Sequence, residues 1–141
     1  MKHKDIRVKS LDHLAIAVRR IKDHLPLYRD ALGMRLEGIY PFKAYGVRIA
    51  SLKLINARLE LIEPAGRNST LNKFLEKRGE GLHHVAFQVR DLRECVAALK
   101  AEGRQWINER PRTGLHHSRI CFLHPSSAKG ILLEFVARLA L

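Results

Sequence analysis

The chain has 141 residues, of which 46% are hydrophobic and 28% are charged. This length suits one domain with a real core, because domains of about 100 to 150 residues bury most of the surface that the unfolded chain exposes. No stretch approaches the roughly 18 uninterrupted apolar residues of a membrane span, and the basic N-terminus lacks the apolar region of a secretory signal. We therefore expect a cytoplasmic protein with no membrane partner.

The formal net charge is +12, from 26 Lys and Arg against 14 Asp and Glu. Such an excess attracts polyanions, including nucleic acids and phosphate-bearing small molecules. The basic residues are spread along the whole chain, aromatic residues are only 6%, and no nucleic-acid-binding signature is present. We therefore expect no nucleic-acid function despite the basic charge.

The first half of the chain predicts a strand, a helix and three further strands. The strand covers residues 12–18, Asp-His-Leu-Ala-Ile-Ala-Val. The helix should begin near Asp23 or His24, because Pro26 is tolerated only in a first turn. The three later β-like runs cover residues 35–39, 47–54 and 58–62, and a short helix over 69–78 follows, ended by Gly79.

The second half repeats this order at an offset of 71 residues. Residues 83–89, His-His-Val-Ala-Phe-Gln-Val, match residues 12–18, so that His84 falls on His13. The helical stripe Ile21, Leu25, Tyr28 recurs as Leu92, Val96, Leu99. Asp91 and Glu94 have the spacing of a capping box, and Gly103 supplies the stop. Three β-like runs follow, over residues 105–108, 118–123 and 131–136.

Each half therefore predicts a βαβββ module. We interpret residues 1–141 as a single domain, with module one at about 8–66, a linker helix at about 69–79 and module two at about 81–138. Cys95 and Cys121 stand in apolar contexts without CxxC spacing, which favours buried free thiols over a disulfide or a metal site.

Two glutamates occupy apolar strand segments. Glu60 lies within Arg-Leu-Glu-Leu-Ile and Glu134 within Leu-Leu-Glu-Phe-Val. A carboxylate in such a place is costly unless something pairs it. A lone strand His is more often structural and a lone strand Glu more often faces solvent, but here both types recur at corresponding positions. Two imidazoles and two carboxylates suit one divalent ion such as Co, Zn, Ni, Mn or Fe.

Four segments carry a family resemblance that covers nearly the whole chain. They are Leu-Asp-His-Leu-Ala-Ile-Ala-Val, Leu-Glu-Leu-Ile-Glu-Pro at 59–64, Lys-Phe-Leu-Glu-Lys-Arg-Gly-Glu-Gly-Leu-His-His at 73–84, and Phe-Leu-His-Pro at 122–125. The sequence resembles the vicinal oxygen chelate superfamily of glyoxalases, bleomycin resistance proteins and dioxygenases, and within it the methylmalonyl-CoA epimerases. The resemblance implies an α+β fold in which two βαβββ modules form a cup-shaped mixed sheet around a metal. It assigns the ligands to His13, Glu60, His84 and Glu134, and it implies a homodimer.

The resemblance implies a metal-dependent isomerase that inverts C2 of an acyl-CoA or related thioester through a stabilised enolate, with Glu134 as a proton carrier. The family's second glutamate is expected just before the second strand of module one, where this chain has Ala44. Tyr45 and Lys43 are candidate substitutes there. In the segment 114–119, which is similar to the family's Gly-Ala-His-Gly-Lys-Arg, His116 and Arg119 are candidates for anchoring a substrate carboxylate or phosphate.

Two other functions remain open from the sequence. A glyoxalase I-like lactoylglutathione lyase needs the same four ligands and does not need a carboxylate at Ala44. A non-catalytic ligand-binding or resistance protein of the superfamily is the further alternative, although such members often lack the ligands that this chain retains.

Overall fold

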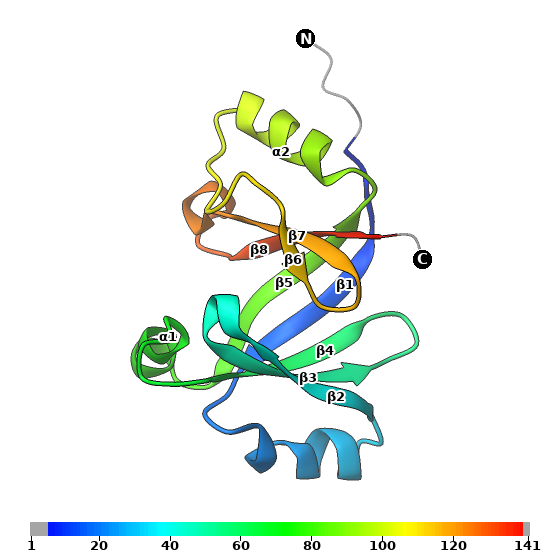
Figure 1. The fold of residues 1–141 in the computed structure, drawn as a ribbon, viewed down its shortest axis with the longest axis vertical. Helices are drawn as coiled ribbons and strands as arrows, with labels where there is room; N and C mark the ends of the chain where they lie inside the picture. The colour runs from blue at the N-terminus through cyan, green and yellow to red at the C-terminus, as the bar shows by residue number, and fades with distance from the viewer. Residues whose placement is uncertain (1–5, 140–141) are drawn as a thin grey trace. The chain divides into compact units, whose positions relative to one another are not determined.

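The computed structural model describes residues 6–139, which form eight strands and a few short helices (Figure 1). The strands are β1 (Val8–Ala17), β2 (Arg35–Phe42), β3 (Val47–Lys53), β4 (Arg58–Pro64), β5 (Gly81–Val89), β6 (Arg112–Gly114), β7 (Ser118–Leu123) and β8 (Leu133–Arg138). The helices are η1 (Ile21–Asp23), η2 (Pro26–Ala31), η3 (Lys43–Tyr45), α1 (Leu71–Arg78), α2 (Leu92–Ala101) and η4 (Pro125–Ala128). Within this described part, no helix has both the length and the apolar character that crossing a membrane would require.

Contacts divide the chain into two compact units. The first unit runs from His13 to His83, and the second combines the chain up to Asp12 with the chain from His84 onward. These boundaries fall inside β1 and inside β5, so each of these two strands contributes residues to both units.

In the first unit the strand order is β2-β3-β4-β1. β1 and β4 are parallel, whereas β2, β3 and β4 pair antiparallel. One face of these strands packs on the segment that follows β1, where Ile21 and Leu25 meet Leu52 and Leu61. That segment is a 3₁₀ turn, η1, followed by the π-helix η2, and Pro26 is the first residue of η2, where its missing N–H costs nothing.

The second unit has the equivalent order, β5-β8-β7-β6. β5 and β8 are parallel, and β8, β7 and β6 pair antiparallel. Its core lies between one face of these strands and α2, and it includes Val89, Leu92, Cys121 and Phe135. The predicted order of a strand, a helical segment and three strands is therefore present in both units. The α-helix predicted to begin near Asp23 or His24 in the first unit is wrong, because that segment forms η1 and η2 instead.

The two α-helices follow the sequence prediction closely. α1 ends at Gly79, whose φ of +73° lies in the left-handed region that favours glycine. α2 begins after Asp91, whose carboxylate accepts the Glu94 N–H at 3.1 Å as an N-cap. The capping pattern in the sequence thus located the start of α2 correctly.

The predicted strand over residues 105–108 is wrong, because the edge strand β6 lies further along, at Arg112–Gly114. In the predicted segment, Trp106 forms only an isolated bridge with Leu123. The Asn108 side chain accepts the Phe122 N–H at 3.1 Å, so a side-chain oxygen takes the place of a backbone carbonyl and the ladder stops there.

Candidate metal and substrate-binding site

In the first unit, the sheet brings His13 and Glu60 together. Glu60 in β4 pairs with Ala15 in the parallel strand β1, and His13 lies two residues earlier on the same face of β1. His13 Nε2 is 3.5 Å from Glu60 Oε1, and both side chains are buried. The strand alternation that hides Leu59 and Leu61 in the core thus aims Glu60 at the opposite, polar face.

The second unit repeats this arrangement with His84 and Glu134. Glu134 in β8 pairs with Ala86 in β5, and His84 again lies two residues earlier. His84 Nε2 is 3.2 Å from Glu134 Oε1, and both residues are less than 10% exposed. The Phe122 ring meets the His84 imidazole edge-on, with centroids 5.3 Å apart, and so supports the orientation of the imidazole.

Each His–Glu pair fits half of a metal-binding set. Ligand atoms about 2.1 Å from one divalent ion lie about 3.0 to 3.4 Å from each other, depending on the coordination geometry. The separations in the two pairs, 3.5 Å and 3.2 Å, are close to that range. An imidazole nitrogen beside a buried carboxylate oxygen is also a donor pair that borderline divalent ions accept. Each of the two His–Glu pairs therefore fits the divalent metal ion that the sequence predicts.

A polar network beside Glu60 was not predicted from the sequence. Arg58 Nε donates to Glu37 Oε1 at 2.7 Å, and the Ser51 hydroxyl donates to the same oxygen at 3.0 Å. Ser51 is fully buried and pairs directly with Glu60 across β3 and β4. The only signal in the sequence was that Arg58 and Glu60 stand two residues apart in an otherwise apolar strand, which places both on one face.

The loop that carries His116 is held by Arg138, which no pattern in the sequence singled out. Arg138 donates to Asp12 at 3.1 and 2.8 Å, and its Nη1 donates to the carbonyl oxygens of Leu115 and His116 at 3.1 and 3.0 Å. His116 and His117 both have φ of +56°, which is unfavourable for residues other than glycine. The partly buried Arg138–Asp12 pair therefore stabilises a strained turn between β6 and β7.

Arg119 lies on the other face of β7 from the His84–Glu134 pair. Phe122 contacts His84, whereas Cys121 and Leu123 belong to the core beneath α2. Alternation along the strand places Arg119 on the same side as Cys121 and Leu123. The structure thus does not bring the guanidinium of Arg119 together with the His84–Glu134 pair of its own unit.

Tyr45 lies in η3, within the hairpin that Phe42 and Val47 close between β2 and β3. Its ring packs on Phe42, with centroids 5.0 Å apart. Ala44, beside it, is exposed and brings no carboxylate to this turn.

The chain is similar to known proteins over most of its length. The family model described as the glyoxalase/bleomycin resistance protein/dioxygenase superfamily matches residues 12–122. The chain belongs to this superfamily. Among its relatives, mitochondrial methylmalonyl-CoA epimerase from Mus musculus is 32% identical over 125 residues, covering 88% of this chain and 70% of the relative. An uncharacterised protein of Bacillus subtilis, YqjC, is 38% identical over 124 residues, covering 88% of this chain and 89% of the relative.

A solved structure agrees with the superfamily assignment. A methylmalonyl-CoA epimerase in complex with methylmalonyl-CoA and NH4+ superposes with a TM-score of 0.90 at 33% identity, covering 95% of this chain and 97% of the other. The mixed sheet built from two βαβββ modules is therefore the superfamily's fold, as the sequence resemblance predicted.

Proposed function

We propose that this protein is a divalent-metal-dependent epimerase that inverts C2 of an acyl-CoA of the methylmalonyl-CoA type. The observation that carries the proposal is the duplicated, buried His–Glu pair, which occupies the same register in both units. Relatives that are about one third identical over most of the chain are methylmalonyl-CoA epimerases, which supports this substrate class.

In this proposal His13, Glu60, His84 and Glu134 together hold one ion of Co, Zn, Ni, Mn or Fe. A divalent ion supplies Lewis acidity toward a substrate carbonyl oxygen and so favours an enolate. Glu134 would remove and return the C2 proton at a carboxylate oxygen, since it is the buried carboxylate that the resemblance assigns to this role. His116 and Tyr45 remain candidates for orienting the substrate.

Ala44 affects the stereochemical outcome that we expect at C2. Inversion requires a proton to leave one face of C2 and another to arrive on the opposite face, and the family's second glutamate is absent at this position. Lys43 and Tyr45 are the ionisable neighbours in η3. We therefore propose that this chain inverts C2 slowly relative to the exchange of its proton with solvent.

The test is deuterium incorporation from solvent into C2 of methylmalonyl-CoA, followed by NMR on protein of measured metal content. Glu134→Gln should slow exchange by at least about a hundredfold, the lower end of the effect of losing a general base. Glu76→Gln, which removes an exposed carboxylate, should leave exchange unchanged. Ala44→Glu should raise the ratio of inversion to exchange. A metal-loaded protein that exchanges no proton would contradict the proposal.

The glyoxalase I-like alternative is favoured by one observation, the alanine at position 44. Isomerisation of a thiohemiacetal can use a single carboxylate beside the metal, so the missing glutamate would not matter. Consumption of the methylglyoxal–glutathione adduct by protein that exchanges no proton of methylmalonyl-CoA would establish this function instead.

We also propose a homodimer, on the family resemblance, and a cytoplasmic location. Light scattering on the purified protein tests the dimer. A monomer at all working concentrations would rule it out.

A further inference from the structure

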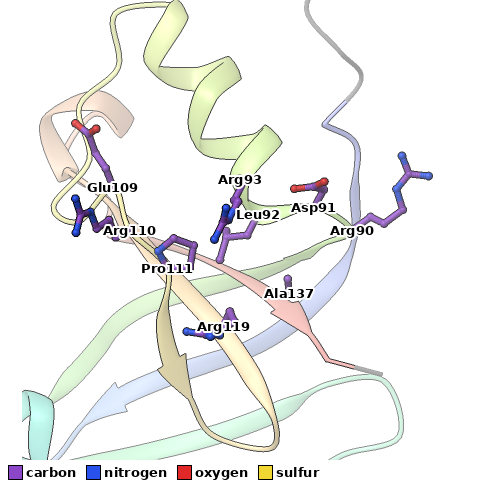
Figure 2. Close-up of a pocket in the computed structure, with 9 residues that line it drawn as sticks. All are labelled: Arg90, Asp91, Leu92, Arg93, Glu109, Arg110, Pro111, Arg119 and Ala137. Atoms are coloured by element: carbon purple, nitrogen blue, oxygen red, sulfur yellow. The ribbon is translucent and has the colours of Figure 1, made fainter. Parts of the chain in front are cut away.

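The second unit contains a basic cavity on the α2 side of the sheet, with a volume of about 680 Å³ (Figure 2). This size is within the range of about 300 to 1,000 Å³ that is typical of small-molecule sites. The cavity lies among the start of α2, the segment before β6, and β7 and β8. The residues lining it are Arg90, Asp91, Leu92, Arg93, Glu109, Arg110, Pro111, Arg119 and Ala137.

Four of these lining residues are arginines and two are acids, a formal balance of +2. Both acids are already engaged. Asp91 caps α2, and Glu109 accepts from Lys100 at 2.7 Å. Between residues 6 and 139, no hydrogen-bond acceptor is found for any of the four guanidinium groups. In Figure 2 Arg93 points from the first turn of α2 toward Pro111, whereas Arg90 points away at the rim.

The first unit has an equivalent cavity of about 510 Å³. Four residues that line it correspond, at the offset of 71, to residues that line the second cavity. They are Arg19 with Arg90, Ile21 with Leu92, Lys22 with Arg93, and Arg48 with Arg119.

In this first cavity the carboxylate of Glu63 accepts hydrogen bonds from two donors. Glu63 Oε2 accepts from Arg48 Nη1 at 2.7 Å, and Glu63 Oε1 accepts the Ile21 N–H, also at 2.7 Å. The arrangement shows that this position in the repeat can hold an anion between a guanidinium and a backbone N–H at the start of a helical segment.

The second repeat keeps the donors and lacks this carboxylate. Glu63 pairs with Arg48 across β4 and β3, and the equivalent partner of Arg119 across β8 and β7 is Ala137. Leu92, which corresponds to Ile21, is the first residue of α2, where an N–H has no partner within the helix. In the second cavity, the space that corresponds to the Glu63 side chain therefore lies beside the Arg119 guanidinium, the Leu92 N–H and the methyl group of Ala137.

We propose that this cavity binds the pyrophosphate group of a nucleotide, with one phosphate in the position that the Glu63 carboxylate has in the first repeat. Arginine forks match phosphate oxygens with paired hydrogen bonds, and several guanidiniums suit two adjacent phosphates better than one carboxylate. The cavity is also larger than a single carboxylate needs. It lies on the opposite face of β7 from the His84–Glu134 pair, so it goes beyond the proposed metal site.

Isothermal titration calorimetry of metal-free protein with ADP, at near-physiological ionic strength, tests the proposal. Ala137→Glu places the first repeat's carboxylate in the second cavity and should weaken ADP binding by about tenfold or more, since charge-assisted hydrogen bonds to phosphate are lost. Arg93→Gln combined with Arg110→Gln should weaken it similarly without adding a side chain to the cavity. Circular dichroism checks that each variant is folded.

The matched control is Arg35→Gln, which removes an exposed arginine from the first unit. Its ADP affinity should stay within about twofold of the original, because general attraction to net charge is weak and screened at this ionic strength. If Arg35→Gln weakens binding as much as the double variant does, or if Ala137→Glu binds ADP as tightly as the unaltered protein, the proposal is overturned. Absence of ADP binding to the unaltered protein would overturn it as well.

Two sources of pyrophosphate can be distinguished with the same variants. If the CoA part of an acyl-CoA substrate occupies the cavity, the Arg93→Gln, Arg110→Gln protein should show a raised KM with little change in kcat. If a free nucleotide occupies it, KM should not change while ADP affinity falls. The binding measurement needs no turnover, so it stands even if the protein proves to have no epimerase activity.

Discussion

At the scale of single residues, burial has opposite consequences for the histidine–glutamate pairs and for the cysteines. His13 and Glu60 are buried side by side, and so are His84 and Glu134, with an imidazole nitrogen near a carboxylate oxygen in each pair. Cys95 and Cys121 are also fully buried, but among apolar neighbours beneath α2. A buried pair can bind a cation, whereas a thiol in such surroundings retains its proton.

The cysteines lead to a prediction about reactivity. Burial raises the pKa of the Cys95 thiol to about 12, with the nearby Cys121 adding to it, and burial raises the pKa of Cys121 to about 11. At about pH 8, roughly one thiol in a thousand or fewer would be a thiolate, which is the reactive form. We expect iodoacetamide to leave both cysteines unmodified in the folded protein and to modify both in concentrated urea, as measured by mass spectrometry. Rapid labelling of the folded protein would contradict the burial seen here.

At the scale of elements, the two repeats satisfy the start of their helical segments differently. α2 has its own N-cap, since Asp91 accepts the Glu94 N–H. η1 has no side-chain cap from the preceding Arg20, and Glu63 from β4 accepts the Ile21 N–H instead. The first repeat therefore uses a tertiary contact where the second uses a local one, and this difference leaves the second cavity open for an anion.

The cap makes a prediction for α2. Asp91→Ala should lower the free energy of unfolding by about 1 kcal/mol, the usual cost of losing an N-cap. Asp91→Asn should cost only a fraction of that, because asparagine accepts the same N–H. Urea denaturation followed by circular dichroism measures both. Equal losses for the two variants would mean that the charge of Asp91, and not the cap, stabilises the helix.

At the scale of the whole molecule, the two units have separate cores and share two strands. One core surrounds Leu61 in the first unit, and the other lies beneath α2 in the second. β1 and β5 each pass from one unit into the other. Because β1 and β5 are continuous strands that each run across a boundary between the units, we expect the described chain to unfold cooperatively.

Leu61→Ala tests this cooperativity. Leu61 is fully buried in the first unit, and truncation should cost about 2 to 5 kcal/mol through lost burial and a cavity. The single tryptophan, Trp106, packs on Phe135 in the second unit and reports on that core. We expect its fluorescence transition in urea to shift together with the circular dichroism transition. Ile55→Ala, at a fully exposed position, should shift neither by more than about 0.5 kcal/mol. A tryptophan transition unmoved by Leu61→Ala would show that the units unfold independently.

The sequence alone determined the features that depend on local periodicity. The offset of 71 residues paired His13 with His84, the aliphatic neighbours of Glu60 and Glu134 singled them out as carboxylates in apolar strands, and capping chemistry located α2. The sequence was less reliable near Asn108, whose side-chain oxygen accepts the Phe122 N–H in place of a backbone carbonyl, and the edge strand lies at Arg112–Gly114 instead.

Only the tertiary structure decided which groups, distant in the sequence, form hydrogen bonds with one another. Arg58 and Glu37 are 21 residues apart and Arg138 and Asp12 are 126 apart, and nothing in the one-dimensional pattern pairs them. The same holds for the carboxylate that joins Arg48 and Ile21 in one repeat and is missing beside Arg119 in the other. The physical reason is that periodicity determines which face of a strand a side chain occupies, whereas its hydrogen-bond partner depends on the register between strands, which is set when the sheet assembles.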